Sequence, residues 1–297
     1  MWKEIKPQQE ARWPDGVRLP IIVSVHHQSE EAAYVFEDGQ VDPFDYGERQ
    51  YGGRRGAWRL LEILGKHNVR GTWIVCGATL EKYPQISREA KAAGHSFAGH
   101  TYEHEMMCNY PADEELRLIR KTVSVFEDLL GEHLRGWRTC FASHNTIDIL
   151  LEHFDFEWDA SMWNDDLPYV IEGYGRRILE IPFSSYSDAA LAVLITKPFP
   201  PSPFCTWSTN TPRFIWNTLK VQFDALYQRG ASKPVLMPLT VHDFIIGRPS
   251  RCKILDDFIA YAKQFEGVVF TTHDEASAWW WKNYSREETS STALETS

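Results

Sequence analysis

Short apolar runs alternate with longer amphipathic segments along most of the chain. The runs at residues 18–25, 69–76 and 234–242 are rich in β-branched side chains, which is typical of strands buried on both faces. Residues 57–67 and 85–93 instead carry apolar side chains at helical spacing. This alternation of strand and helix predicts an α/β fold with a mainly parallel sheet and right-handed crossovers.

The same patterns continue to residue 282, without a repeat period or a domain linker. We therefore predict a single domain over residues 1–284. Residues 32–56 are rich in Asp, Gly, Tyr and Arg and read as a loop, whereas residues 285–297 consist mainly of Ser, Thr and Glu and predict a disordered tail. Further strands are predicted at residues 136–141, 156–163, 178–183 and 267–271, and further helices at residues 111–130, 146–151, 212–229, 251–265 and 274–282.

Composition excludes several classes of protein. The net charge of −10 over 297 residues argues against a nucleic-acid partner, which requires a basic patch. The five cysteines are widely spaced and include no CxxC pair, so a thiolate zinc site is not expected. No apolar run approaches the roughly 20 residues needed to cross a bilayer, and the N-terminus lacks the apolar run of a signal peptide. We expect a cytoplasmic protein with reduced thiols and no membrane partner.

Candidate chemistry is concentrated in the stretch from Gly94 to Glu105. His100 and His104 are four residues apart, and on a helical turn this spacing would place both imidazoles on one face, where they could bind one metal ion. The pair His26-His27 ends the first predicted long strand. Because the carboxyl ends of parallel strands collect chemistry, His26 is the candidate third ligand. Side chains alternate along a strand, so His27 should point to the opposite face.

The order of several motifs resembles the polysaccharide deacetylase family, the NodB-homology hydrolases. The resemblance is greatest to the branch that contains peptidoglycan deacetylase-like proteins, cyclic imide hydrolases and a metal-independent type of allantoinase. It covers about residues 10–282. The motifs are Trp13-Pro14-Asp15-Gly16, Tyr46-Gly47 with Gly71-Thr72-Trp73, the stretch from Gly94 to Glu105, Gly136-Trp137-Arg138, residues 165–169, Glu180-Ile181-Pro182 with Asp188, and residues 242–249.

The resemblance implies a distorted (β/α)7-type barrel that hydrolyses an amide bond at the carboxyl ends of its strands. By position, His26, His100 and His104 match the metal ligands, His242 matches the general acid for the leaving amine, and Arg138 matches the arginine that orients a catalytic carboxylate. The family's first motif carries two acids, whereas the matching residues 24–27 here contain none. The metal would therefore be a divalent ion, with zinc expected from three imidazoles, and the replacement for the missing base is not identified by the sequence.

We predict hydrolysis of a carbon–nitrogen bond in a small amide, cyclic imide or lactam by a metal-activated water. Trp163, Phe141 and Tyr46 are the expected walls of a mainly apolar pocket, with Asp188 as a further substrate-binding residue. Three alternatives remain open: a metal-independent, allantoinase-like amidohydrolase, an N-acetyl sugar or peptidoglycan deacetylase, and a non-catalytic binding protein that retains the barrel. The resemblance also implies a homotetramer.

Overall fold

The computed structural model describes residues 2–5, 13–33, 35–36, 38–139, 141–184 and 211–284. Over these residues the strands form one sheet in the order β1-β7-β8-β6-β5-β4-β3-β2-β10, and β9 also pairs with β2. The strands are β1 (Lys3–Ile5), β2 (Leu19–His27), β3 (Thr72–Val75), β4 (Ser96–Gly99), β5 (Gly136–Trp137), β6 (Trp158–Asp159), β7 (Tyr169–Gly173), β8 (Arg176–Glu180), β9 (Met237–His242) and β10 (Val268–Thr271).

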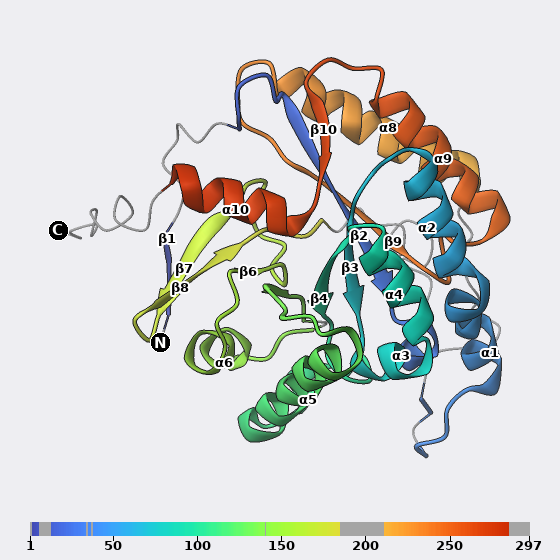
Figure 1. Ribbon diagram of the computed structural model, residues 1–297, viewed down its shortest axis with the longest axis vertical. Helices are drawn as coiled ribbons and strands as arrows, with labels where there is room; N and C mark the ends of the chain where they lie inside the picture. The colour runs from blue at the N-terminus through green and yellow to red at the C-terminus, as the bar shows by residue number, and fades with distance from the viewer. Residues whose placement is uncertain are drawn as a thin grey trace.

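The strands from β8 through β6, β5, β4, β3 and β2 to β9 and β10 run parallel, and only the pairs β1–β7 and β7–β8 are antiparallel. Helices cover the outer side of this curved sheet (Figure 1). Among the described strands none joins β1 to β10, so the barrel is open. This architecture confirms the predicted α/β fold of the distorted (β/α) barrel type.

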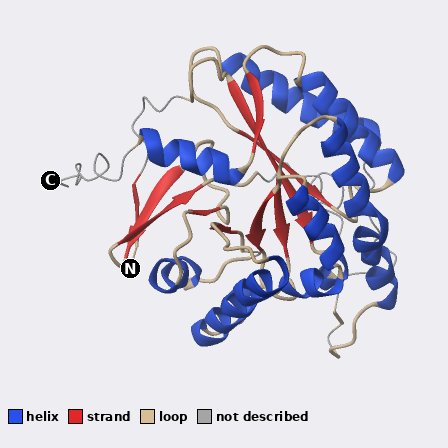
Figure 2. Cartoon of the chain, in the orientation of Figure 1, coloured by secondary structure: helices blue, strands red, loops and turns tan. Residues whose placement is uncertain are grey.

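The helices follow the strands in the order that a parallel sheet requires, and Figure 2 shows them as an outer layer around the strands. Short 3-10 turns, η1 (Ser29–Ala32) and η3 (Met107–Asn109), lie in the loops after β2 and β4. The helices are α1 (Pro43–Tyr51), the π-helix η2 (Gly52–Gly56), α2 (Ala57–Lys66), α3 (Gly77–Lys82), α4 (Pro84–Ala92), α5 (Ala112–Leu130), α6 (Thr146–His153), α8 (Pro212–Arg229), α9 (Pro249–Ala262) and α10 (His273–Asn283).

All nine residues of β2 are buried, because helices cover one face of the strand and the barrel interior encloses the other. Ile21 and Val23 pack in the apolar cluster under the helices, whereas Ile22 packs with residues of the barrel interior. Since side chains alternate along a strand, His26 shares the interior face with Ile22. His27 faces outward, where its ring meets Trp73, as expected from the alternation.

The prediction of a loop over residues 32–56 was wrong, because this segment contains α1 and η2. Asp42 caps α1 by accepting a hydrogen bond from the backbone N–H of Phe44, and Pro43 occupies the first helical position. The polar composition of the segment hid these helix signals. No helix among the described residues is long and apolar enough to span a membrane.

Candidate functional site

The centre of the site is a pair of histidines at the ends of two adjacent strands. His26 and His242 are register partners in the parallel pair β2–β9. Paired positions project to the same face of a sheet, and the two ring centres lie 4.6 Å apart. Both residues are buried. The pairing of two sequence-distant strands therefore creates half of the site.

His100 and His104 complete the cluster from the loop that follows β4. The ring centres of His100 and His104 are 5.0 Å apart, and those of His26 and His100 are 4.9 Å apart. The prediction of a helical turn here was wrong, because residues 100–106 form an irregular loop. Thr101 and His104 adopt left-handed φ values of 61° and 59°, and these turn the loop back so that both imidazoles still meet.

Burial keeps three of these imidazoles neutral. It lowers the pKa of His26 and of His100 well below the usual value, and the neighbouring histidines lower both further. Burial, with the positive charge of Arg49 and the nearby His242, lowers the pKa of His104 to about 3. A neutral imidazole offers a lone pair, which is the form that binds a metal ion or accepts a proton.

The rings of His100 and His26 differ in their hydrogen bonds. Nδ1 of His100 donates to the backbone oxygen of Arg138 at 2.7 Å, and since a carbonyl only accepts, the lone pair of His100 is on Nε2. Neither ring nitrogen of His26 has a hydrogen-bond partner among the described residues. A buried polar atom without a partner is costly, so His26 suits a ligand that the cluster would bind.

Imidazoles bound to one zinc ion at 2.0–2.1 Å have ring centres about 5 Å apart. Two pairs of the predicted ligands have similar separations, His26–His100 at 4.9 Å and His100–His104 at 5.0 Å. However, within the part of the chain that the structure describes, no three or more His, Cys, Asp or Glu side chains form a group that could hold a metal ion. Neutral imidazoles are zinc ligands by residue type, whereas their arrangement in the described residues is not that of a metal group, so metal binding by His26, His100 and His104 stays a prediction.

Arg138 follows β5 and lies beside the cluster. Its positive charge lowers the pKa of His26 and His100, and its guanidinium lies 4.3 Å above the ring of Phe183. Phe183 in turn lies 5.9 Å from the ring of His26. Phe183 was not a predicted site residue, although its position soon after Glu180-Ile181-Pro182 could have indicated it.

Two of the predicted pocket walls, Trp163 and Phe141, have largely exposed side chains. Trp163 is 59% exposed and contacts Phe183 at 5.5 Å between ring centres, so it connects the cluster to the surface. Phe141 is also largely exposed, on the loop after β5. Asp188 lies outside the described residues. Trp163 is thus linked to the histidine cluster through one ring.

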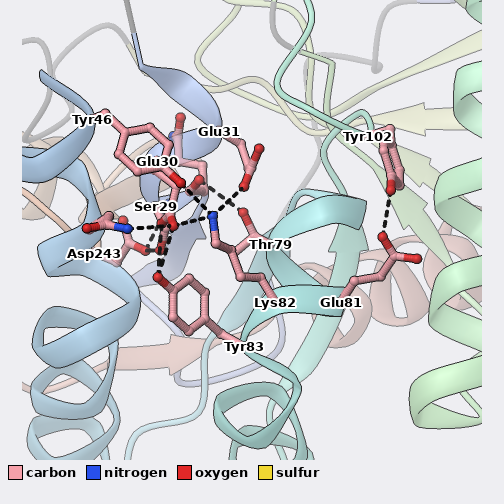
Figure 3. A network of polar contacts seen from close by, with 12 residues as sticks. Ser29, Glu30, Glu31, Tyr46, Thr79, Glu81, Lys82, Tyr83, Tyr102 and Asp243 are labelled. Atoms are coloured by element: carbon pink, nitrogen blue, oxygen red, sulfur yellow. Dashed lines mark hydrogen bonds and ion pairs between the residues drawn. The ribbon is translucent and has the colours of Figure 1, made fainter. Parts of the chain in front are cut away.

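Tyr46 belongs to a polar network at the end of β2 (Figure 3). The ammonium of Lys82 donates to the hydroxyl of Tyr46 at 2.9 Å and pairs with Glu30 at 2.5 Å. The hydroxyl of Tyr83 donates to the same carboxylate at 3.0 Å. Figure 3 also shows the Lys82 nitrogen between Glu30 and Glu31. Tyr46 is therefore part of this polar network beyond the end of β2.

Asp243, which follows His242, was missed by the sequence analysis. Its Oδ2 accepts hydrogen bonds from Nδ1 of His27 at 2.7 Å and from the backbone and hydroxyl of Ser29. A Cβ atom at Gly52 would lie 2.5 Å from the Asp243 carboxylate, and one at Gly56 would lie 1.9 Å from its backbone oxygen. Only glycines allow η2 to pack here, and the spacing of glycines at 52, 53 and 56 was the available signal.

A groove of about 990 Å³ lies elsewhere, between α6 and the β7–β8 hairpin. It is lined by residues such as Trp2, Phe154 and Arg176, and none of the predicted site residues lines it. The chemistry of the histidine cluster is therefore independent of this groove.

Comparison with known proteins finds similar sequences over most of the chain. A sequence profile described as Polysaccharide deacetylase matches residues 28–151. The peptidoglycan deacetylase of Helicobacter pylori is 26% identical over 263 residues, covering 80% of this chain and 87% of that protein. A putative polysaccharide deacetylase of Schizosaccharomyces pombe is 24% identical over 312 residues, covering 92% and 94%. The chain is thus similar to the polysaccharide deacetylase family over residues 28–151 and to these two relatives over most of its length.

Solved structures with the same fold superpose over nearly the whole chain. A crystal structure titled PuuE allantoinase has a TM-score of 0.81 and 25% identity, covering 92% of this chain and 93% of that one. A probable polysaccharide deacetylase from Pseudomonas aeruginosa also has a TM-score of 0.81, at 23% identity, covering 92% and 94%. The relatives and solved structures are thus named as deacetylases and an allantoinase, and they share the fold of this chain.

Proposed function

We propose that this protein, which is similar to polysaccharide deacetylases, hydrolyses a carbon–nitrogen bond in a small amide, cyclic imide or lactam at the histidine cluster. The observation that carries the proposal is the convergence of four buried or partly buried imidazoles at the carboxyl ends of strands and in their loops. Three of them have lowered pKa values and are neutral at physiological pH. Neutral imidazoles supply what amide hydrolysis needs, namely ligands or bases for a water and an acid for the leaving nitrogen.

In this proposal, His26, His100 and His104 hold a divalent metal ion, with zinc the expected ion. A bound zinc ion would lower the pKa of a water to about 7. His242 lies beside His26 and transfers a proton from the attacking water to the nitrogen as the C–N bond breaks. Arg138 supplies a positive charge near the developing negative charge. Trp163 and Phe183 give the entrance an apolar wall, which suits a planar ring better than a hydrated sugar.

A metal-free route at the same cluster is the second candidate. It is favoured by the ring nitrogens of His26, which have no partner among the described residues and would take the proton from water directly. In both routes water adds to the carbonyl carbon and the nitrogen leaves with a proton. The routes differ in whether a metal ion or an imidazole activates the water.

The test uses protein purified without a histidine tag, its metal content, and turnover of succinimide, hydantoin, allantoin and N-acetylglucosamine oligomers. We expect turnover of a cyclic imide or amide, a loss of at least about 100-fold in kcat/KM in His242→Asn, and no change in His133→Asn, a control at an exposed histidine. One equivalent of zinc whose removal abolishes turnover would support the first route. Turnover without metal would support the second.

Two results would contradict the proposal. If no compound of the panel is hydrolysed while His100→Ala retains ligand affinity, the chain is a binding protein. If only the acetylated sugar is hydrolysed, the cluster is a deacetylase site and the small-ring substrate class is wrong.

A further inference from the structure

Two acids lie side by side in the barrel next to the histidine cluster. Asp159 ends β6 and Glu180 ends β8, and the two residues are register partners in this parallel pair. Both are completely buried. Paired positions of neighbouring strands place their side chains on the same face, so the two carboxyl groups share one enclosed space.

The hydrogen bonds of the pair require a proton. Asp159 accepts from the hydroxyl of Ser161 at 2.8 Å and from its backbone N–H at 3.2 Å, and Oε1 of Glu180 accepts from the backbone N–H of Met162 at 2.9 Å. Oε2 of Glu180 has no donor among the described residues. Two ionised carboxylates are acceptors only, so Asp159 and Glu180 can hydrogen-bond to one another only if one of them is protonated. Asp159 already has two donors, which places the proton on Glu180.

The electrostatics agree with this assignment. Burial raises the pKa of both acids, and the neighbouring Asp159 raises the pKa of Glu180 further, to well above its usual range. The other ionisable groups that act on the pair are Arg138, whose charge lowers both pKa values, and Tyr169 of β7, whose hydroxyl donates to Asn164. Both directions favour a proton held by the pair, on Glu180, with the negative charge on Asp159.

Arg138 connects the pair to the proposed reaction centre. Its positive charge lowers the pKa values of Asp159 and Glu180. The same charge lowers the pKa values of His26 and His100. The strand order β4, β5, β6, β8 explains this, because Arg138 follows the strand between the histidine loop and the acid pair.

We propose that Asp159 and Glu180 act as one unit that shares a single proton, and that its single negative charge balances Arg138 beside the histidine cluster. Both are positioning residues, since neither is placed to touch substrate. The catalytic part of this inference rests on the proposed function, whereas the shared proton does not.

The test compares Glu180→Gln with the double variant Asp159→Asn/Glu180→Gln. Glutamine keeps the shape of a protonated acid and the single charge on Asp159, so Glu180→Gln should retain kcat/KM within about threefold. The double variant removes the charge, and we expect kcat/KM to fall at least about 30-fold, mainly through kcat. Glu115→Gln is the matched control, because Glu115 is equally buried but accepts hydrogen bonds from Ser143 and Thr146.

Two readouts do not depend on turnover. The infrared band of a protonated carboxylic acid should be present at pH 7, disappear in Glu180→Gln and persist in Glu115→Gln. Because the native state holds a proton that the unfolded chain releases near pH 4.3, the contribution of this proton to the unfolding free energy should fall as pH rises above this value, opposite in sign to the contribution of the buried histidines. In Glu180→Gln this contribution of one proton to the slope of unfolding free energy against pH should be absent.

The outcomes separate the two proposals. A protein that shows the band and the slope but hydrolyses nothing retains the shared proton and loses the proposed function. Absence of the band, or its persistence in Glu180→Gln, overturns the shared proton whatever the turnover. Equal kcat/KM in the single and double variants overturns the role of the charge.

Discussion

At the scale of single residues, burial in this protein sets protonation, and His273 illustrates it outside the proposed site. The ring of His273 stacks on Trp158 at 4.5 Å between ring centres. Burial, with the charge of Arg138, lowers its pKa to about 3. The unfolded chain protonates this imidazole near pH 6.5, so the native state binds fewer protons between the two values.

His273→Phe should therefore make the protein less sensitive to acid. Stability falls as pH drops from about 6.5, and each such histidine contributes about 1.4 kcal/mol per pH unit to the slope. Between pH 6 and 4, the slope of unfolding free energy against pH should be smaller in the variant by the equivalent of one proton. Urea unfolding at a series of pH values measures this slope. Val221→Ala, at an exposed position without an ionisable group, should leave the slope unchanged. Equal slopes for wild type and His273→Phe would show that His273 is protonated in the folded protein.

At the scale of elements, large rings pack directly on strand backbones. A Cβ atom on Gly136 of β5 would lie 1.9 Å from the ring of Trp158, and one on Gly99 of β4 would lie 2.2 Å from the ring of Trp137. Both tryptophans are completely buried. The spacing between β4, β5 and β6, which places Arg138 near His100, thus depends on the absence of a side chain at these two positions.

Gly136→Ala should lower the free energy of unfolding by about 1–3 kcal/mol, because the methyl group forces Trp158 or the backbone to move. Gly65→Ala is the matched control in α2, where no atom lies within 4 Å of the added methyl group. It should raise stability by roughly 0.5–1 kcal/mol through helix propensity. Urea unfolding measures both changes. A neutral Gly136→Ala would mean that the strands have room to separate.

At the scale of the whole molecule, contacts between distant parts of the chain assemble the site. The carboxylate of Asp243 links the loop after β9 to His27 and Ser29 at the end of β2, more than 200 residues away in sequence. Among the described strands β9 pairs only with β2, so this link is a second connection between the ends of these two strands.

Asp243→Asn should lower the free energy of unfolding by about 2–4 kcal/mol, because an amide cannot accept every hydrogen bond that the buried carboxylate receives. Asp256→Asn, which removes the partner of Lys66 near the surface, should cost less than about 1 kcal/mol. Chemical denaturation compares the two. Similar costs for both variants would show that the link is not a main support of the barrel.

The expected homotetramer remains a prediction that sedimentation can test.

The sequence by itself determined the alternation of strands and helices, the position of the histidines near strand ends and the family resemblance, because these depend on local periodicity and residue order. It predicted a helical turn for His100 and His104, since four-residue spacing is indistinguishable from an irregular loop until the φ values are known. Only the tertiary structure placed His242 beside His26, and Asp159 beside Glu180. Strand register joins residues that no local pattern connects, and burial then determines which of them are charged.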